Sequence, residues 1–207
     1  LYAFGTLNSD NTGLYGWPYS SKVVTDNELF DANVNGRFNA FGRSHTVIAG
    51  VSRSRQEATT DTYDYDTTKY QYLPLPAFPY GGSVYPEPVW GALTPASDGD
   101  QTLTRFYGAT RVAVTDRIKA ILGVNAIQLE RHGSSRYGSN NGNDPTYPVV
   151  RKSSPYFGLT YDVTPDMLAY LSHSDIFQNQ DQKGKDLKTY LAPMKGVNQE
   201  LGVKAEW

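Results

Sequence analysis

The C-terminal stretch Gly196–Trp207 constrains the fold most strongly, because apolar and polar side chains alternate along it without a break. Such alternation is typical of a β-strand with one apolar and one polar face. A strand in a soluble protein is usually about half this long, whereas a strand that crosses an outer membrane needs roughly 9–11 residues. The stretch therefore predicts a sheet that separates lipid from an aqueous lumen. The apolar face comprises Val197, Leu201, Val203, Ala205 and Trp207, with Gln199 among them.

Other parts of the chain repeat this alternation, which predicts an antiparallel all-β protein of about seven to eight strands. In one segment the phase is ambiguous, and we place Ala169 and Leu171 on the apolar face and Tyr170 and Ser172 on the polar face. An eighth strand is expected in Leu1–Asn8, where the alternation is weaker. Together with the C-terminal stretch, the expected strands are Leu29–Ala40, His45–Gln56, Thr104–Val114, Arg117–Glu130, Pro155–Val163 and Met167–Phe177.

The expected connections alternate between short and long. Tight turns are predicted at Gly42-Arg43, Thr115-Asp116 and Thr164-Pro165. Short periplasmic turns and long extracellular loops are the asymmetry of transmembrane β-barrels, so this pattern favours a barrel segment. The long polar loops are predicted over Glu57–Leu103, Arg131–Ser154 and Gln178–Lys195.

Composition narrows the class further. Hydrophobic residues make up 39% of the chain and the mean hydropathy is −0.52, too polar for a helical membrane protein. A formal net charge of −2 argues against a nucleic-acid partner held by counterion release, and the lack of cysteine excludes disulfides. Since no signal peptide opens the chain and it stops in mid-pattern, we expect an internal piece of a longer protein. A passive porin-type channel and a soluble all-β binding module remain alternatives, because alternation alone is common to all three.

The sequence shows no arrangement of residues that indicates an enzyme. His45, His132 and His173 lie in different segments and lack the spacing of a zinc site, so we expect isolated surface or rim histidines. The acidic run Asp61–Asp66 lacks the glycine and the twelfth-position Glu of an EF-hand, which favours a solvated loop over a metal site.

The predicted loop Glu57–Leu103 is rich in aromatic residues, and the proline-containing run Leu73–Tyr80 stiffens it. Tyr and Trp side chains provide a large contact area and a polar tip, which suits a ligand with both apolar and polar surface. An alternative is that these rings only pack the loop or lie at the membrane interface. The candidate ligand-binding residues are Tyr70, Tyr72, Tyr80, Tyr85 and Trp90.

Several segments resemble motifs of TonB-dependent siderophore receptors, in the order found in that family. Gly36–His45 reads GRFNAFGRSH and resembles the hairpin motif G-x-F-x-x-F-G-R-x-H. The sequence departs from the family at Asn179, where Pro is usual, and at Gln199, where Tyr is usual. Similar matches are found for Thr115–Gly123, Leu159–Tyr170, Asp175–Gln180 and Gly196–Lys204.

The resemblance implies a barrel of 22 strands with a plug domain inside it and a TonB box before the plug. Residues 1–207 would be part of the barrel domain only, without plug, TonB box or the last strands. The implied function is uptake of ferric siderophores across the outer membrane of a Gram-negative bacterium, energised by TonB–ExbB–ExbD through the plug. The iron would sit in the siderophore, so no protein-bound cofactor or metal is expected. Hydroxamate, catecholate and mixed siderophores all share this scaffold.

Overall fold

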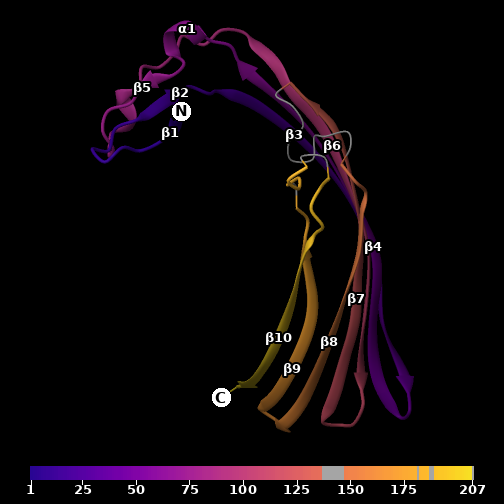
Figure 1. Cartoon of the computed structure of the whole chain (residues 1–207). Coiled ribbons are helices and arrows are strands. Elements are labelled where there is room, and N and C mark those ends of the chain that lie inside the picture. The colour runs from indigo at the N-terminus through magenta and orange to yellow at the C-terminus, as the bar shows by residue number, and fades with distance from the viewer. Residues whose placement is uncertain (137–146, 181, 187–188, 207) are drawn as a thin grey trace.

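The computed structural model describes residues 1–136, 147–180, 182–186 and 189–206. Seven long strands form one antiparallel sheet in the order β10-β9-β8-β7-β6-β4-β3. The sheet curves into an open gutter with β3 and β10 at its edges (Figure 1). Its strands are β3 (Ser21–Ala40), β4 (Arg43–Tyr63), β6 (Leu93–Ala113), β7 (Ile118–Ser135), β8 (Val150–Thr164), β9 (Met167–Gln178) and β10 (Met194–Ala205).

A second, smaller sheet has the order β1-β2-β5. The expected strand in Leu1–Asn8 exists as β1, but it pairs with β2 in this small sheet and does not extend the large one. The prediction of an eighth strand in the wall is therefore wrong, and the large sheet has seven. The small sheet and its neighbours comprise β1 (Tyr2–Gly5), β2 (Leu14–Trp17), β5 (Leu73–Pro74), helix α1 (Thr67–Tyr70) and 3-10 helix η1 (Gly82–Val84).

The strands run further than the apolar alternation predicted. Glu57–Tyr63 belongs to β4 and Leu93–Leu103 belongs to β6, so the first long connection covers only residues 64–92. In this region both faces of the strands carry polar side chains, so the alternation is lost although the main-chain pairing continues. Glu57, for example, pairs with Asp26 on one side and with Asp100 on the other. The other two long connections are likewise shorter than predicted, at 136–149 and 179–193. Residues 137–146 and Trp207 lie outside the described part of the chain.

The asymmetry of the connections is confirmed. Residues 41–42, 114–117 and 165–166 form the turns at one end of the large sheet, and the long connections lie at the other (Figure 1). The C-terminal end of β10 lies at the turn end, whereas the small sheet lies beyond the opposite end (Figure 1).

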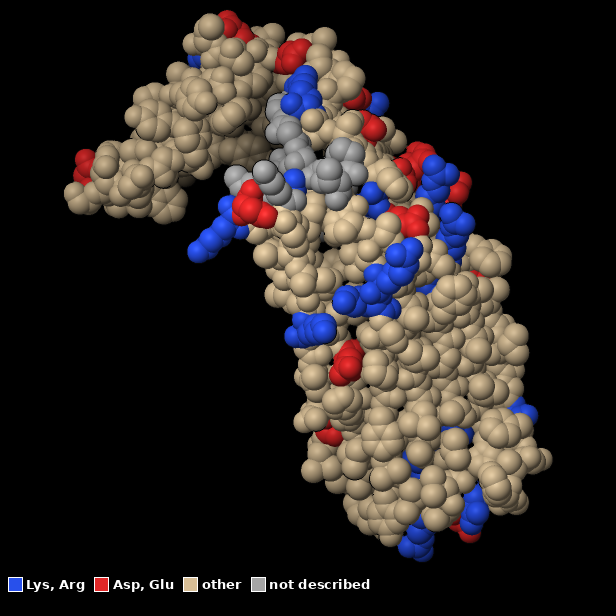
Figure 2. Space-filling view, turned by 45° about the vertical axis from the view of Figure 1, so that its right-hand side comes forward, with Lys and Arg blue, Asp and Glu red and all other residues tan. Residues whose placement is uncertain are grey.

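The strand register confirms the predicted faces. Leu201 pairs with Leu171, which pairs with Leu159, and this row continues through Ala120 to Val112. Directly paired residues project from the same face, so these apolar side chains share one surface. The surface is the convex side of the gutter, where a broad area without charges is visible in Figure 2. The opposite, concave face carries Glu200, Lys204, Asn125, Arg111 and Asn35.

Glycine and tyrosine pair repeatedly on the concave face. Each glycine pairs directly with its tyrosine across the strands, and a Cβ atom on the glycine would overlap the tyrosine ring. The missing side chain lets the ring lie flat over the neighbouring backbone, which is a recognised use of glycine inside a strand. The three pairs are Gly50 with Tyr107, Gly123 with Tyr156 and Gly202 with Tyr170.

His45 is not the surface or rim residue that the sequence suggested. It lies in β4 and is only 2% exposed. Its Nδ1 atom accepts a hydrogen bond from the Ala113 main-chain N–H at 3.1 Å, and its Nε2 atom lies 2.9 Å from the Ala40 carbonyl oxygen. A neutral ring protonated at Nε2 satisfies both groups at once, so His45 links the β3–β4 turn to β6. His132 is exposed and His173 is half-buried, and each lies near an aspartate.

Candidate ligand-binding site

A lobe built around the small sheet overhangs the concave face of the gutter (Figure 1). The ends of β3, β4 and β6 lean toward it, and the chain supplies it from two places, residues 1–20 and the connection 64–92. Main-chain hydrogen bonds join these two segments: the Tyr72 N–H donates to the Gly16 carbonyl at 3.1 Å, and the Leu75 N–H donates to the Leu14 carbonyl at 2.8 Å. The lobe is therefore a joint product of residues about sixty positions apart in the sequence.

Local sequence signals explain how the connection 64–92 turns. Asp66 is the N-cap of α1, and its carboxylate accepts hydrogen bonds from the main-chain N–H groups of Thr68 and Lys69. Such a residue satisfies donors that the first helical turn leaves open. The Thr68 hydroxyl also donates to this carboxylate at 2.6 Å, and this bond lowers the pKa of Asp66 from its ordinary value.

An aromatic cavity lies between the lobe and the outward ends of the strands, with a volume of about 650 Å³. Phe4 packs against Trp17 with ring centroids 6.2 Å apart, and Tyr72 lies within 5.7 Å of the same Trp17 ring. A cavity of this size falls within the range of ordinary small-molecule sites. Its aromatic lining comes from Tyr2, Phe4, Trp17, Tyr19, Tyr63 and Tyr65.

The polar part of the lining is small and well held. Arg136 donates from Nη1 to the Thr94 hydroxyl and from Nη2 to the Thr62 hydroxyl, both at 2.7 Å. Asp64 also lines the cavity and accepts a hydrogen bond from Thr94 at 3.3 Å. Aromatic walls with one fixed guanidinium and one carboxylate suit a ligand that has flat apolar faces and a polar edge.

The structure separates the five predicted residues into those near the cavity and those that pack the lobe. Tyr72 contacts the lining residues Phe4 and Trp17, and Trp90 contacts the lining residues Tyr63 and Tyr65. These two candidates therefore contact rings of the cavity lining without lining the cavity themselves.

The other three candidates have different surroundings. Tyr70 is only 7% exposed, and the Tyr85 hydroxyl donates to its carbonyl oxygen and to that of Gly16. Burial raises the pKa of Tyr85 above its ordinary value. Tyr80 packs on Phe78, with centroids 5.8 Å apart, and neither residue lines the cavity.

Sequence reasoning did not select the aromatic residues of the N-terminal segment. Tyr2, Phe4, Trp17 and Tyr19 supply much of the lining, and the density of rings in the first twenty residues was the available signal. Their meeting with residues 64–92 depends on the pairing of β2 with β5, which no local pattern indicates.

The acidic run Asp61–Asp66 does not form a metal site. Asp61 lies in β4, Asp64 bonds Thr94 and Asp66 caps α1. Within the described ranges, no three His, Cys, Asp or Glu side chains are placed to hold a metal ion. No helix of the described chain is long and apolar enough to cross a membrane.

Sequence comparison matches the whole chain to one family. Residues 1–207 match the family described as TonB dependent receptor-like, beta-barrel. The chain is 30% identical over 219 aligned positions to a ferric-pyoverdine BN7/BN8 receptor of Pseudomonas putida, covering 98% of this chain and 26% of that protein. It is 27% identical to a ferripyoverdine receptor of Pseudomonas aeruginosa, with coverage of 92% and 23%. The chain thus spans about a quarter of the length of these relatives.

Solved structures show the same fold. A ferripyoverdine receptor of P. aeruginosa bound to a heterologous pyoverdine superposes with a TM-score of 0.75 at 24% identity, over 99% of this chain and 26% of that one. The ferric preacinetobactin receptor of Acinetobacter baumannii superposes with a TM-score of 0.73 at 18% identity, over 98% and 30%. The sheet order, the asymmetric connections and the family match over residues 1–207 all indicate the same fold. The chain therefore belongs to the TonB-dependent receptors, which are transport proteins and not enzymes, and it forms part of their β-barrel in the Gram-negative outer membrane.

Proposed function

We propose that this chain is part of a receptor that binds a ferric siderophore at its outward face and imports it with energy delivered by TonB–ExbB–ExbD. The observation that carries the proposal is the aromatic cavity between the lobe and the strand ends. Relatives named for ferric pyoverdines make that siderophore class the first to test. The siderophore brings the iron, so the site needs rings and hydrogen-bonding groups and no metal ligands of its own.

The open edges of the sheet are one reason to expect a larger assembly. Lipid offers no hydrogen-bond partners to the main-chain N–H and C=O groups of an unpaired strand edge, so a membrane-spanning sheet must close into a barrel. Since β3 and β10 lie at the two edges of the large sheet, residues 1–207 supply one slice of a barrel. The remaining strands, the plug and the TonB box would come from sequence outside these residues.

Tyr72 and Trp90 are the strongest of the five candidates, because both contact rings that line the cavity and so help to hold those rings in place. Tyr72 is also 53% exposed. Aromatic anchors commonly carry a large share of binding free energy, and truncating a true hot spot costs about 2 kcal/mol or more.

The test is ligand binding by the full-length receptor on whole cells that lack TonB, so that transport does not mask affinity. Alanine is introduced singly at Tyr70, Tyr72, Tyr80, Tyr85 and Trp90, and binding of ferric pyoverdine is titrated. At least two variants, Tyr72→Ala and Trp90→Ala among them, should bind at least about tenfold more weakly, a change of about 1.4 kcal/mol.

The matched control is Phe41→Ala. Phe41 is 93% exposed in a turn at the opposite end of the sheet, so its loss should leave affinity unchanged. Receptor abundance in the membrane is measured for every variant. If all five alanine variants bind like the wild type, the lobe only packs, and recognition lies in other parts of the receptor.

A further inference from the structure

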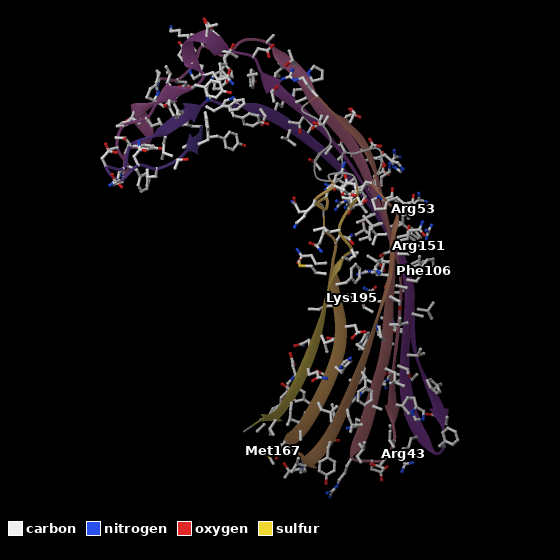
Figure 3. All side chains as sticks on the ribbon, in the orientation of Figure 1. Arg43, Arg53, Phe106, Arg151, Met167 and Lys195 are labelled. Carbon is white, nitrogen blue, oxygen red and sulfur yellow. The ribbon has the colours of Figure 1, made fainter. Side chains whose placement is uncertain are left out.

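Two arginines lie close together on the concave face, near the turn end of the large sheet. Arg37 on β3 pairs with Thr46 on β4, and Thr46 pairs with Arg111 on β6. Directly paired residues project from the same face, so Arg37 shares the concave face with Arg111. Each arginine is within four residues of a turn, and both therefore lie between the levels of Phe106 and Arg43 in Figure 3.

A shallow cavity of about 360 Å³ is lined by both arginines. Thr46 and Ala109, which also line it, have short side chains and leave room between the two guanidinium-bearing side chains. Asn35 adds an amide to the lining. The cavity therefore combines space for a small polar group with several hydrogen-bond donors, and we refer to it as the two-arginine pocket.

Neither arginine of this pocket is neutralised by the protein. Within the described ranges, Arg37 and Arg111 form no ion pair with a carboxylate. Arg105 provides the contrast on the same face of β6. Its Nη2 atom lies 3.9 Å from the Asp31 carboxylate, and its Nε atom donates to the Ser52 hydroxyl at 3.1 Å. The positive charge of the pocket is thus available to a partner from outside these residues.

The chemistry of the pocket favours an anion. A guanidinium matches a carboxylate with two parallel hydrogen bonds, and a cleft lined by charges of one sign raises the local concentration of the opposite sign. Glu200 ends the same row of the sheet on β10. It is four strands from Arg111, a separation of roughly 19 Å, so this carboxylate does not occupy the pocket.

We propose that the two-arginine pocket binds a carboxylate of the imported ligand, as an inner site that the ligand reaches after it leaves the aromatic cavity. This inference rests on the proposed function. The aromatic cavity lies at the outward ends of the strands and the two-arginine pocket lies near the turns, so a ligand that crosses the barrel moves from the first toward the second. The arginines draw its negative charge in that direction and favour ligands that carry a free carboxylate.

The test compares binding with import by the full-length receptor. One probe is a ferric pyoverdine with a free carboxylate outside its iron-binding groups, and the other is the same molecule with that carboxylate converted to a methylamide. On cells lacking TonB, the double variant Arg37→Gln/Arg111→Gln should bind both probes like the wild type, because the aromatic cavity is unchanged. In cells with TonB it should import the carboxylate probe about tenfold more slowly, the lower end of what charge focusing supplies, and the amide probe at the wild-type rate.

Two further variants separate charge from structure. Arg37→Lys/Arg111→Lys keeps both positive charges and should restore most of the import of the carboxylate probe. Asp31→Asn/Arg105→Gln removes an ion pair from the same face without changing the net charge, and it should leave the import of both probes unchanged. Receptor abundance in the membrane is measured for every variant.

Two outcomes would overturn the inference while the proposed function stands. Unchanged import of the carboxylate probe by Arg37→Gln/Arg111→Gln would show that the pocket is not visited. Equal loss of import for both probes would show that the arginines hold a carboxylate of the receptor itself, such as one of the plug. If the wild type binds and imports neither probe, the proposed function fails and the inference fails with it.

Discussion

In the large sheet, neighbouring strands follow one another along the chain, whereas in the lobe Gly16 pairs with Leu73 across more than fifty residues. The large sheet, which forms the wall of the barrel, is held by continuous main-chain hydrogen bonds between its strands. Its side chains alternate between the convex, lipid-facing side and the concave side. The lobe has only short strands, and its aromatic rings pack against one another. Changes in the wall should therefore act on the stability of the whole barrel, and changes in the lobe should act on ligand binding and local opening.

The largest expected effect comes from placing a charge on the lipid side of the wall. Leu201 is 85% exposed on the convex face, so Leu201→Arg should lower the free energy of unfolding of the full-length receptor by roughly 2–4 kcal/mol if the site lies near the bilayer midplane. Glu200→Arg, one residue earlier on the concave face, should cost far less. Unfolding by denaturant in lipid vesicles measures both, and equal costs would mean that the faces are assigned wrongly.

The glycine–tyrosine pairs offer a second test of the wall. A Cβ atom at Gly123 would overlap the Tyr156 ring, so Gly123→Ala should destabilise the barrel by about 1–3 kcal/mol through overpacking. Gly36→Ala is the control, because no atom lies within 4 Å of the position that a Cβ atom would take there. Adding Tyr156→Ala should recover part of the loss in Gly123→Ala; no recovery would contradict ring packing as the cause.

The third prediction concerns His45, which links the turn between β3 and β4 to β6. His45→Ala removes the acceptor of the Ala113 N–H and the partner of the Ala40 carbonyl, and an unsatisfied buried group costs about 1–3 kcal/mol. His132→Ala, at an exposed position near Asp100, should change stability much less. Thermal unfolding of the folded barrel, followed by its altered gel mobility, distinguishes them, and equal melting points would refute the linking role of His45.

The smallest effect is expected in the lobe. Tyr85→Phe removes the hydroxyl that donates to the Tyr70 and Gly16 carbonyls, a net loss of about 0.5–1.5 kcal/mol. Hydrogen exchange of the Tyr72 amide, which donates to Gly16, should accelerate several-fold while the wall amides keep their protection. Acceleration spread over β3 and β4 as well would show that lobe and wall open as one unit.

The same contrast explains how much of the molecule was predictable from its sequence. Alternation predicted the seven strands and their faces, including the phase of Met167–Phe177, because lipid on one side forces a period of two. It ended the strands too early, since beyond the apolar band side chains such as Glu57 and Asn27 face water on both sides of the sheet and no longer alternate between apolar and polar. The cavity could not be predicted from local sequence patterns, because Phe4, Trp17 and Tyr72 come together only through the pairing of β2 with β5.

The strands that overrun the apolar band shape how a ligand would move. Beyond the apolar band of the convex face, β4 continues from Arg53 to Tyr63, a rise of roughly 35 Å along the strand. In a closed barrel this part of the large sheet would form a vestibule above the membrane, with the lobe at its rim. A ligand that dissociates into such a confined space stays at a high local concentration near the site, as a tethered ligand does. Recapture then competes well with escape, so the residence time in the receptor can exceed the lifetime of any single contact.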